Sequence, residues 1–150
     1  MTELLFSITF LLAVPFWALM ILAPKWGTTE KVIASPLIVV PPALVYLVLA
    51  VANFPDLWAA VSAPELGPLA EFLGTPAGTA LGWAHFIAWD LFVGRWMYRQ
   101  SRELGIHPLV MAPVLLVTIL ASPIGLLLFL PVRALRARRE KSPHTVSQSV

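Results

Sequence analysis

One stretch, GWAHFIAWDLFVGRWMYRQ at residues 82–100, constrains the fold more than any other part of the sequence. It is apolar enough to enter a bilayer, yet it carries His85, Asp90 and Arg95. A charged side chain near the middle of a membrane helix costs about 2.5 to 3.5 kcal/mol on insertion scales, so such side chains usually face a protein interior and find a partner there. We therefore expect a membrane protein with a polar site inside its helices.

The helical periodicity separates the three polar residues of this stretch. At about 100° per residue, Asp90 lies about 140° from both His85 and Arg95, so the three cannot form a triad on one face. His85 shares its stripe with three aromatic residues, Trp89, Phe92 and Trp96. Asp90 shares its stripe with Trp83, and it needs a partner from another helix, for which Asn53 or Arg95 of a neighbouring protomer is a candidate.

Composition fixes the broad class. Of the 150 residues, 59% are apolar and only 12% are charged, and the mean hydropathy is +0.83. These values exclude a soluble domain of average composition. The absence of cysteine excludes disulfides, thiol nucleophiles and cysteine-bound metals, and ten Lys and Arg provide too little basic surface for a nucleic-acid partner.

Four apolar segments are long enough to span a membrane: residues 4–23, 32–52, 79–98 and 108–130. Between the second and third, residues 53–78 contain no Lys or Arg and four prolines, which predicts two short amphipathic helices lying in the interface. The predicted fold is all-α and polytopic, with a four-helix transmembrane domain at 1–135. Residues 136–150 are basic and then polar, which predicts a disordered tail.

The positive charges do not decide the orientation of four spans. Five cations lie between Arg133 and Lys141, a cluster expected to contact anionic lipid. Four spans would place the other five on the opposite side; these are Lys25, Lys31, Arg95, Arg99 and Arg102. The contiguity of the tail cations favours a cytoplasmic tail, whereas the equal count is also what a dimer of oppositely inserted protomers would show.

Several kinds of site are not indicated. His85 is followed at i+3 and i+4 by Ala88 and Trp89, so no helical metal-binding pattern is present, and we expect neither a metal nor a cofactor. No phosphate-binding loop or Ser-His-Asp order occurs. The two readings of Asp90, a proton-exchanging group or a structural hydrogen bond between helices, both remain open, as do pigment binding and simple packing for His85.

Three motifs together resemble a known family. They are PFWALMILAP at 15–24, the pattern H-x4-D-L-F-x2-R-x2-Y that runs from His85 to Tyr98, and SPIGLL from Ser122. In these the sequence resembles the small membrane proteins of the plant neoxanthin-synthesis type, named for an abscisic-acid-deficient mutant and with bacterial relatives. The resemblance covers Pro15 to about residue 135. It implies a four-helix membrane protein required for making neoxanthin, the allenic xanthophyll formed from an epoxy-carotenoid.

The leading hypothesis is a membrane protein that accommodates a carotenoid-like isoprenoid and acts on it as a cofactor-free isomerase. Asp90 or His85 would protonate the epoxide oxygen while the other accepts a proton, with Arg95 in the same set. The residues predicted to bind the substrate are Trp83, Trp89, Phe92, Trp96, Tyr98 and Asn53. The alternatives are a proton-coupled exporter working as a dimer, and a scaffold without catalysis.

The expected partners are membrane lipid, the isoprenoid, and either a second copy of the chain or enzymes of carotenoid synthesis. No Ser-rich and Arg-rich transit segment precedes the first apolar run, which indicates a prokaryotic or an already mature chain, and we expect the cytoplasmic membrane of a bacterium.

Overall fold

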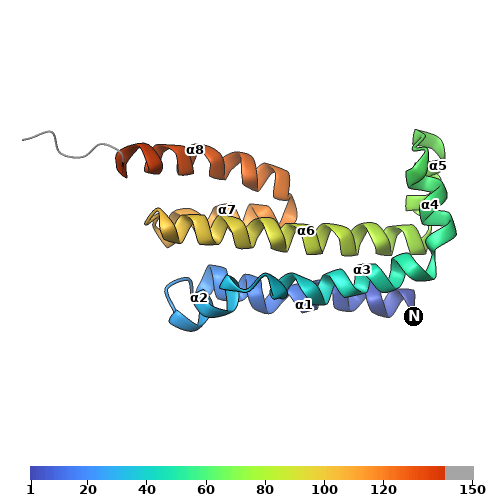
Figure 1. The fold of residues 1–150 in the computed structure, drawn as a ribbon, viewed down its shortest axis with the longest axis horizontal. Helices are drawn as coiled ribbons and strands as arrows, with labels where there is room; N and C mark the ends of the chain where they lie inside the picture. Colours follow the sequence, from blue (N-terminus) through green and yellow to red (C-terminus); the bar gives the residue numbers. More distant parts are fainter. Residues whose placement is uncertain (141–150) are drawn as a thin grey trace, which may run out of the picture. The chain divides into compact units, whose positions relative to one another are not determined.

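The computed structural model describes residues 1–140, and the regular structure of this range is entirely helical (Figure 1). The elements are α1 (Thr2–Leu22), α2 (Gly27–Ala34), the short 3-10 helix η1 (Pro36–Val39), α3 (Val40–Ala52), α4 (Phe54–Ser62), α5 (Leu66–Gly74), α6 (Pro76–Glu103), α7 (Pro108–Leu120) and α8 (Ser122–Glu140). The predicted all-α class is confirmed. The chain divides into two compact units, Met1–Phe92 and the residues from Val93 on, so the boundary falls inside α6.

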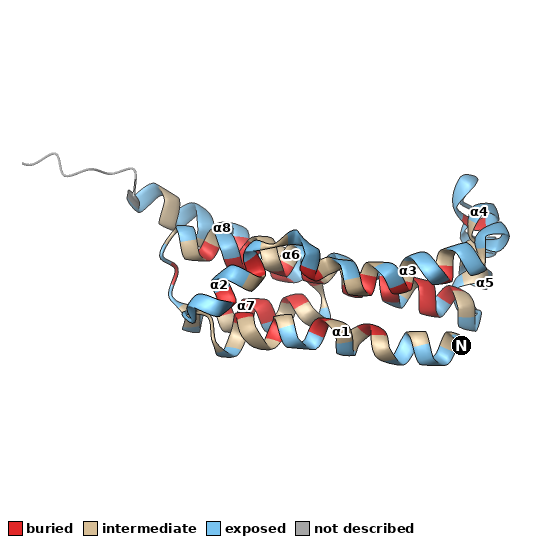
Figure 2. Cartoon of the chain, turned by 60° about the horizontal axis from the view of Figure 1, so that its bottom comes forward, coloured by how far each residue is buried: buried red, intermediate tan, exposed pale blue. Residues whose placement is uncertain are grey.

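The core of the first unit lies where α1, α3 and the first part of α6 pack together (Figure 2). Val45 and Leu49 of α3 meet a stripe of α6 with helical spacing, which consists of Ala80, Leu81 and Ala84. Leu5 and Leu12 of α1 pack against this cluster. The small alanines let the helix backbones approach closely, which is how membrane helices gain packing energy.

Prolines give the segment before α3 its shape. The backbone at Ser35 is extended, because Pro36 disfavours the helical conformation of the residue before it, and the axes of Gly27–Ala34 and Pro36–Ala52 differ by 74°. The expected second span, 32–52, is therefore shortened at its start. Pro41 and Pro42 stand in the first turn of α3, where a missing N–H costs no helical hydrogen bond. They begin a helix and do not kink one.

The segment between α3 and α6 forms two short helices, α4 and α5, as the sequence predicts. On these two helices Leu57, Leu69 and Phe72 are half-buried, whereas Trp58 and Val61 are exposed. After α5 the chain turns directly into α6, and a Cβ on Gly78 would overlap the carbonyl of Phe72.

Residues 108–130, expected to form one span, form two helices instead. Only Ala121 separates α7 from α8, and α8 folds back against α7 (Figure 1). Two residues of the SPIG sequence explain the turn. Pro123 lacks the N–H that a continuing helix would use, and a Cβ on Gly125 would overlap the Thr118 hydroxyl and lie 2.8 Å from the Thr118 Cα. SPIG, a break that the sequence places inside the fourth apolar segment, is thus a tight turn that reverses the chain, and the prediction of a single span over 108–130 is wrong.

Side-chain contacts fix the direction of α8 in the second unit. The ring of Trp96 on α6 lies 5.5 Å from that of Phe129 on α8, and one turn further along both helices Arg133 Nε donates to Gln100 Oε1 over 2.9 Å. Since both residue numbers rise together, α8 runs in the same direction as this part of α6. The carboxyl ends of α6 and α8 therefore lie at the same end of the unit.

Three hydroxyl side chains of α1 and α7 bond within their own helix. Ser7, Thr9 and Thr118 each donate to the carbonyl four residues earlier, over 2.8, 2.5 and 2.8 Å. Thr9 and Thr118 are completely buried. Their donors are therefore satisfied without any other helix.

The C-terminal boundary differs from the expected one. α8 continues to Glu140, beyond the predicted end of the helical domain at 135. The rest of the predicted disordered tail, residues 141–150, lies outside the described residues.

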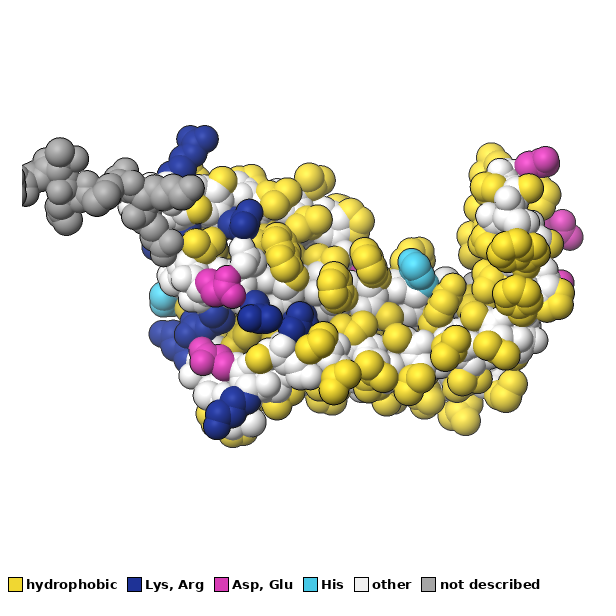
Figure 3. Space-filling model, viewed as in Figure 1, with side chains coloured by type: hydrophobic (Ala, Val, Ile, Leu, Met, Phe, Trp, Pro, Cys, Tyr) yellow, Lys and Arg dark blue, Asp and Glu magenta, His cyan; other side chains and the backbone are white. Residues whose placement is uncertain are grey.

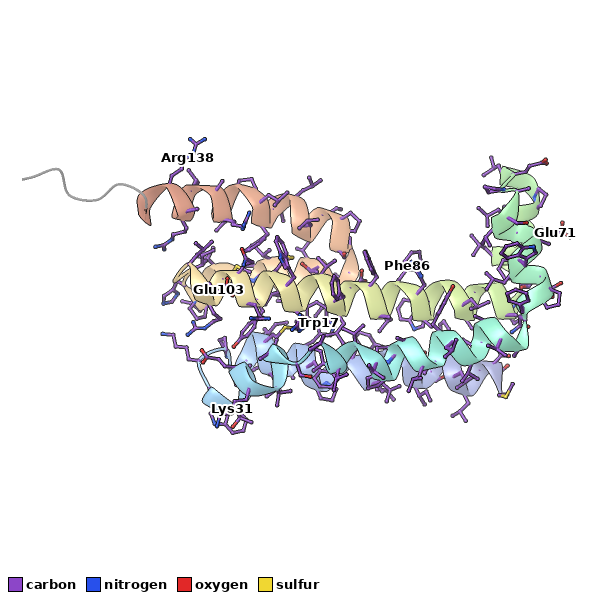
Figure 4. All side chains as sticks on the ribbon, in the orientation of Figure 1. Trp17, Lys31, Glu71, Phe86, Glu103 and Arg138 are labelled. Carbon is purple, nitrogen blue, oxygen red and sulfur yellow. The ribbon has the colours of Figure 1, made fainter. Side chains whose placement is uncertain are left out.

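Among the described helices, α1 is the one whose length and hydropathy (mean 2.3) suffice by themselves for a membrane crossing. The bent segment formed by α2, η1 and α3 adds a second if it is counted as one span. The charges of the first unit divide between its ends: Lys31 on α2 and Glu71 on α5 lie at opposite ends of α3 (Figure 4). The visible face of α4 and α5 carries acidic and hydrophobic side chains (Figure 3).

Candidate functional site

A hollow of about 200 Å³ opens on the surface of the first unit, between α3 and α6. Its lining consists of Val39, Ala43 and Tyr46 from η1 and α3, and of His85, Ala88, Trp89 and Phe92 from α6. Each helix contributes residues spaced three or four apart, so one face of α3 meets one face of α6. The space exists because the alanines lie among large side chains.

His85 and Tyr46 are the polar members of this lining. Their ring centroids lie 5.7 Å apart with the planes at 61°, an edge-to-face arrangement. His85 also lies edge-to-face against the neighbouring ring of Phe86, at 6.1 Å. Because His85 is exposed, its imidazole is accessible from outside the unit. An imidazole can donate or accept a proton near neutral pH, and a phenol can donate or accept a hydrogen bond beside it.

Trp89 and Phe92 form an aromatic wall of the hollow. Their rings are stacked, with centroids 5.4 Å apart and planes at 23°. Both remain largely exposed, at 58% for Trp89 and 42% for Phe92. Exposed apolar rings of this size need an apolar surrounding or a ligand to cover them. The predicted stripe of His85, Trp89 and Phe92 therefore corresponds to one physical surface.

Asp90 lies on a different face of α6. It is half-buried beside the fully buried Leu91, and it is not among the residues that line the hollow. This position agrees with the angular separation predicted from the sequence. The arrangement thus pairs His85 with Tyr46, and the role of Asp90 in a reaction stays a prediction.

The remaining predicted site residues have other surroundings. Trp83 packs against two rings of α1, those of Phe6 and Phe10, at 5.6 and 6.5 Å. Asn53 follows the end of α3, and its side-chain amide donates to the Leu49 carbonyl over 2.9 Å. The same carbonyl also accepts the backbone N–H of Asn53 over 3.1 Å, so the amide adds a second bond at the end of α3.

Three predicted site residues belong to the second unit: Arg95, Trp96 and Tyr98. Arg95 is half-buried, and Tyr98 is buried with 2% of its surface exposed. Trp96 contacts Phe129 and lies under the guanidinium of Arg133, whose Cζ is 5.8 Å from the ring centroid. These residues therefore lie in that unit and do not line the hollow.

The sequence did not indicate Tyr46 as a site residue. It lies in the apolar run of α3, 39 positions before His85, and no local pattern connects the two residues. One signal was present: Tyr46 is one of only two tyrosines in the chain, and it is the polar one among its neighbours in that run. Among the described residues, no three His, Asp or Glu side chains are grouped as metal ligands would be.

In a comparison with protein families, residues 4–129 match the family described as ABA DEFICIENT 4-like. Comparisons with curated proteins and with solved structures find no match.

Proposed function

We propose, because the chain belongs to the ABA DEFICIENT 4-like family, that it is a multi-pass membrane protein that binds the end ring of a carotenoid-like isoprenoid and isomerises it. The family is related to neoxanthin formation, which supports an oxygenated carotenoid as the kind of substrate. The observation that carries the proposal is the hollow between α3 and α6, where one imidazole and one phenol lie among aromatic and aliphatic side chains.

The size of the hollow favours an end ring over a whole pigment molecule. Pockets for complete small molecules measure roughly 300 to 1,000 Å³, whereas this one measures about 200 Å³. A long polyene would then extend along exposed apolar side chains outside the hollow. Phe86 and Leu47 on the same two helices are such side chains, with 61% and 53% of their surfaces exposed.

The chemistry needs an acid and a base. Opening an epoxide to an allene adds a proton to the epoxide oxygen as the C–O bond breaks and removes a proton from a neighbouring carbon, whose electron pair forms the new double bond. The atoms of substrate and product are the same, so the net change requires no oxidant or reductant. In our proposal, His85 and Tyr46 exchange these two protons, because they line the same hollow with ring centroids 5.7 Å apart.

The proposed membrane arrangement follows from helix lengths and connectivity. At 1.5 Å per residue, α1 is about 32 Å long, the η1–α3 segment about 26 Å and α6 about 42 Å, so each can cross hydrocarbon about 30 Å thick with modest adjustment. The α7–α8 hairpin then enters and returns on one side. With three crossings and a hairpin, all ten Lys and Arg fall on the same side, which the positive-inside rule assigns to the cytoplasm.

Accessibility labelling tests this arrangement, because the natural chain has no cysteine. In single-cysteine variants, we expect Thr28→Cys and Ser142→Cys to react from the cytoplasmic side and Ala63→Cys from the opposite side. A simple four-span chain would instead place positions 28 and 142 on opposite sides. Labelling of that kind would refute the hairpin topology.

The one-sided charge distribution weakens the exporter alternative. That alternative rested on an equal number of cations on the two sides, which four separate spans would give, and on the lone acid Asp90. In the arrangement proposed here, supported by the parallel course of α8 and the end of α6, the first of these two grounds is lost. The scaffold alternative remains as an outcome of the pigment experiment.

The pigment experiment uses bacterial cells engineered to accumulate an epoxy-carotenoid, with and without the chain. We expect a new isomeric carotenoid, seen by chromatography and by its absorption spectrum, in cells that express the protein. Epoxy-carotenoid that co-purifies with the protein unchanged would support the scaffold alternative. If the pigment is neither changed nor bound, the proposed function is wrong.

A further inference from the structure

Arg133 differs from the other cations near the end of α8 in how its side chain is held. Its Nε donates to Gln100 Oε1 over 2.9 Å, and its guanidinium lies over the ring of Trp96, 5.8 Å from the centroid. By contrast, Arg138 is exposed and points away from the helix (Figure 4). Arg133 is therefore ordered before any ligand arrives, whereas Arg138 is an ordinary surface charge.

Neighbouring side chains fix the positions of Gln100 and Trp96, the two residues that hold Arg133. The Gln100 Nε2 donates to Glu103 Oε2 over 2.7 Å, which directs the amide oxygen of Gln100 toward Arg133. Glu103 also lies 3.9 Å from Arg99, so its carboxylate is shared within α6. Trp96 is supported from the other side by Phe129 of α8, whose ring is edge-on at 5.5 Å. Side chains of α6 and α8 in the second unit therefore hold the Arg133 guanidinium in one position.

The two terminal nitrogens of Arg133 remain available. Within residues 1–139, no hydrogen bond or ion pair engages them, and the side chain is exposed. The terminal nitrogens of a guanidinium form a planar fork that matches two oxygens of a phosphate, with charge-assisted hydrogen bonds stronger than neutral ones. A fork that is ordered in advance loses less entropy when it binds.

The surroundings favour a phosphate that carries acyl chains. The turns of α8 before Arg133 expose leucines to the outside, with 68% of Leu127 and 48% of Leu128 accessible. Arg136, Arg138 and Arg139 follow within two turns. Apolar side chains, an aromatic ring and then cations are the order expected from hydrocarbon to headgroup.

We propose that Arg133, positioned by Gln100 and Trp96, binds the phosphate of an anionic phospholipid at a specific site of the second unit. The site is more than a general attraction, because it requires the guanidinium fork and its orientation. It depends on the membrane location proposed above and not on the carotenoid reaction.

Substitutions that leave the net charge unchanged can distinguish a specific lipid site from general electrostatic attraction. The purified full-length protein in neutral detergent is titrated with phosphatidylglycerol, and binding is followed by native mass spectrometry and by the shift in unfolding temperature. Arg133→Lys keeps the charge but loses the fork, and we expect about tenfold weaker binding, as for the loss of one charge-assisted hydrogen bond. The matched control Arg138→Lys should change binding less than about twofold, since it preserves a charge that is not held in place.

Gln100→Leu provides a second test without any change of charge. We expect it to weaken phosphatidylglycerol binding severalfold, because Arg133 loses the acceptor that orients it. The unfolding temperature without lipid shows whether each variant is folded. If Arg133→Lys does not fold, the phosphatidylglycerol binding of Gln100→Leu and Trp96→Phe decides the test instead. Equal effects of Arg133→Lys and Arg138→Lys, or unchanged binding in Gln100→Leu, would overturn the proposal.

Two further ligands identify the source of the phosphate. Phosphatidylcholine, which carries no net charge, should bind much more weakly than phosphatidylglycerol, and inorganic phosphate at the same concentration should give no shift. A shift with inorganic phosphate that disappears in Arg133→Lys would mean a free phosphate ion is the ligand, and the lipid proposal would be wrong. No pigment is present in these measurements, so their failure would leave the proposed carotenoid function untouched.

Discussion

The His85→Phe variant should bind the carotenoid but convert it at least about 100-fold more slowly, the usual contribution of a general acid or base. Phenylalanine fills a similar volume and keeps the edge-to-face contact with Tyr46, so the shape of the hollow is preserved. It cannot exchange a proton. Because His85 is exposed, the replacement should not disturb the packing of the unit. The measurement is the conversion rate in membranes, together with the pigment bound per protein.

Three companion variants make this result specific. Trp58→Ala removes an exposed ring on α4 that does not line the hollow, and conversion should be retained. Trp89→Ala removes part of the aromatic wall, and pigment binding itself should weaken. Tyr46→Phe removes only the phenol oxygen and should slow conversion if that group is the second proton carrier. Full conversion by His85→Phe would refute the acid-base role of His85.

Substitutions of Asp90 distinguish a chemical role of its side chain from a structural one. Because it lies outside the hollow, we expect Asp90→Asn to retain conversion and Asp90→Leu to lower stability, by about 0.6 to 2 kcal/mol for an interhelical hydrogen bond. Loss of conversion in a folded Asp90→Asn protein would restore Asp90 as a proton-exchanging residue.

The Gly125→Ala variant should be destabilised by about 3 kcal/mol, at the upper end of the range for overpacking. The added Cβ would overlap the Thr118 hydroxyl and would lie 2.8 Å from the Thr118 Cα. A side chain can change its rotamer, but the backbone of α7 can yield only if the hairpin opens. Thermal unfolding in detergent measures the loss, and the contacts of α8 with Trp96 should weaken with it.

A matched glycine provides the control. Gly27, the first residue of α2, has no atom within 4 Å of the position a Cβ would take, and Gly27→Ala should be neutral or slightly stabilising. Adding Thr118→Ala to Gly125→Ala should restore only part of the stability, because the close backbone atom remains. Wild-type stability of Gly125→Ala would mean that the hairpin is not closely packed.

The sequence predicted what depends on local periodicity. Apolar composition gave the all-α class, prolines marked the two short helices between α3 and α6, and the 3.6-residue repeat placed His85 with Trp89 and Phe92. The fourth span was wrong because an apolar count cannot show that a chain reverses at Ser122. The reversal depends on the contact of Gly125 with Thr118, which forms only when two helices are packed.

The site could be predicted only in part for the same reason. The stripe on α6 is a property of one helix, but its partner Tyr46 comes from another helix, and single-sequence patterns do not report pairs across helices. Asn53 was predicted to bind the substrate or to pair with Asp90; its amide donates to a carbonyl of its own helix, and its part in binding stays a prediction. Trp96 shares the periodicity of His85 but belongs to the other compact unit.

The hydroxyl bonds within α1 and α7 have a consequence for the order of assembly. Thr9 and Thr118 are completely buried in the finished fold, yet each already has its acceptor four residues earlier in its own helix. A newly made helix can therefore leave the insertion machinery without exposing an unsatisfied hydroxyl to lipid. In the membrane arrangement proposed above, α1 and the α7–α8 hairpin can therefore enter the bilayer separately and associate with the other helices afterwards.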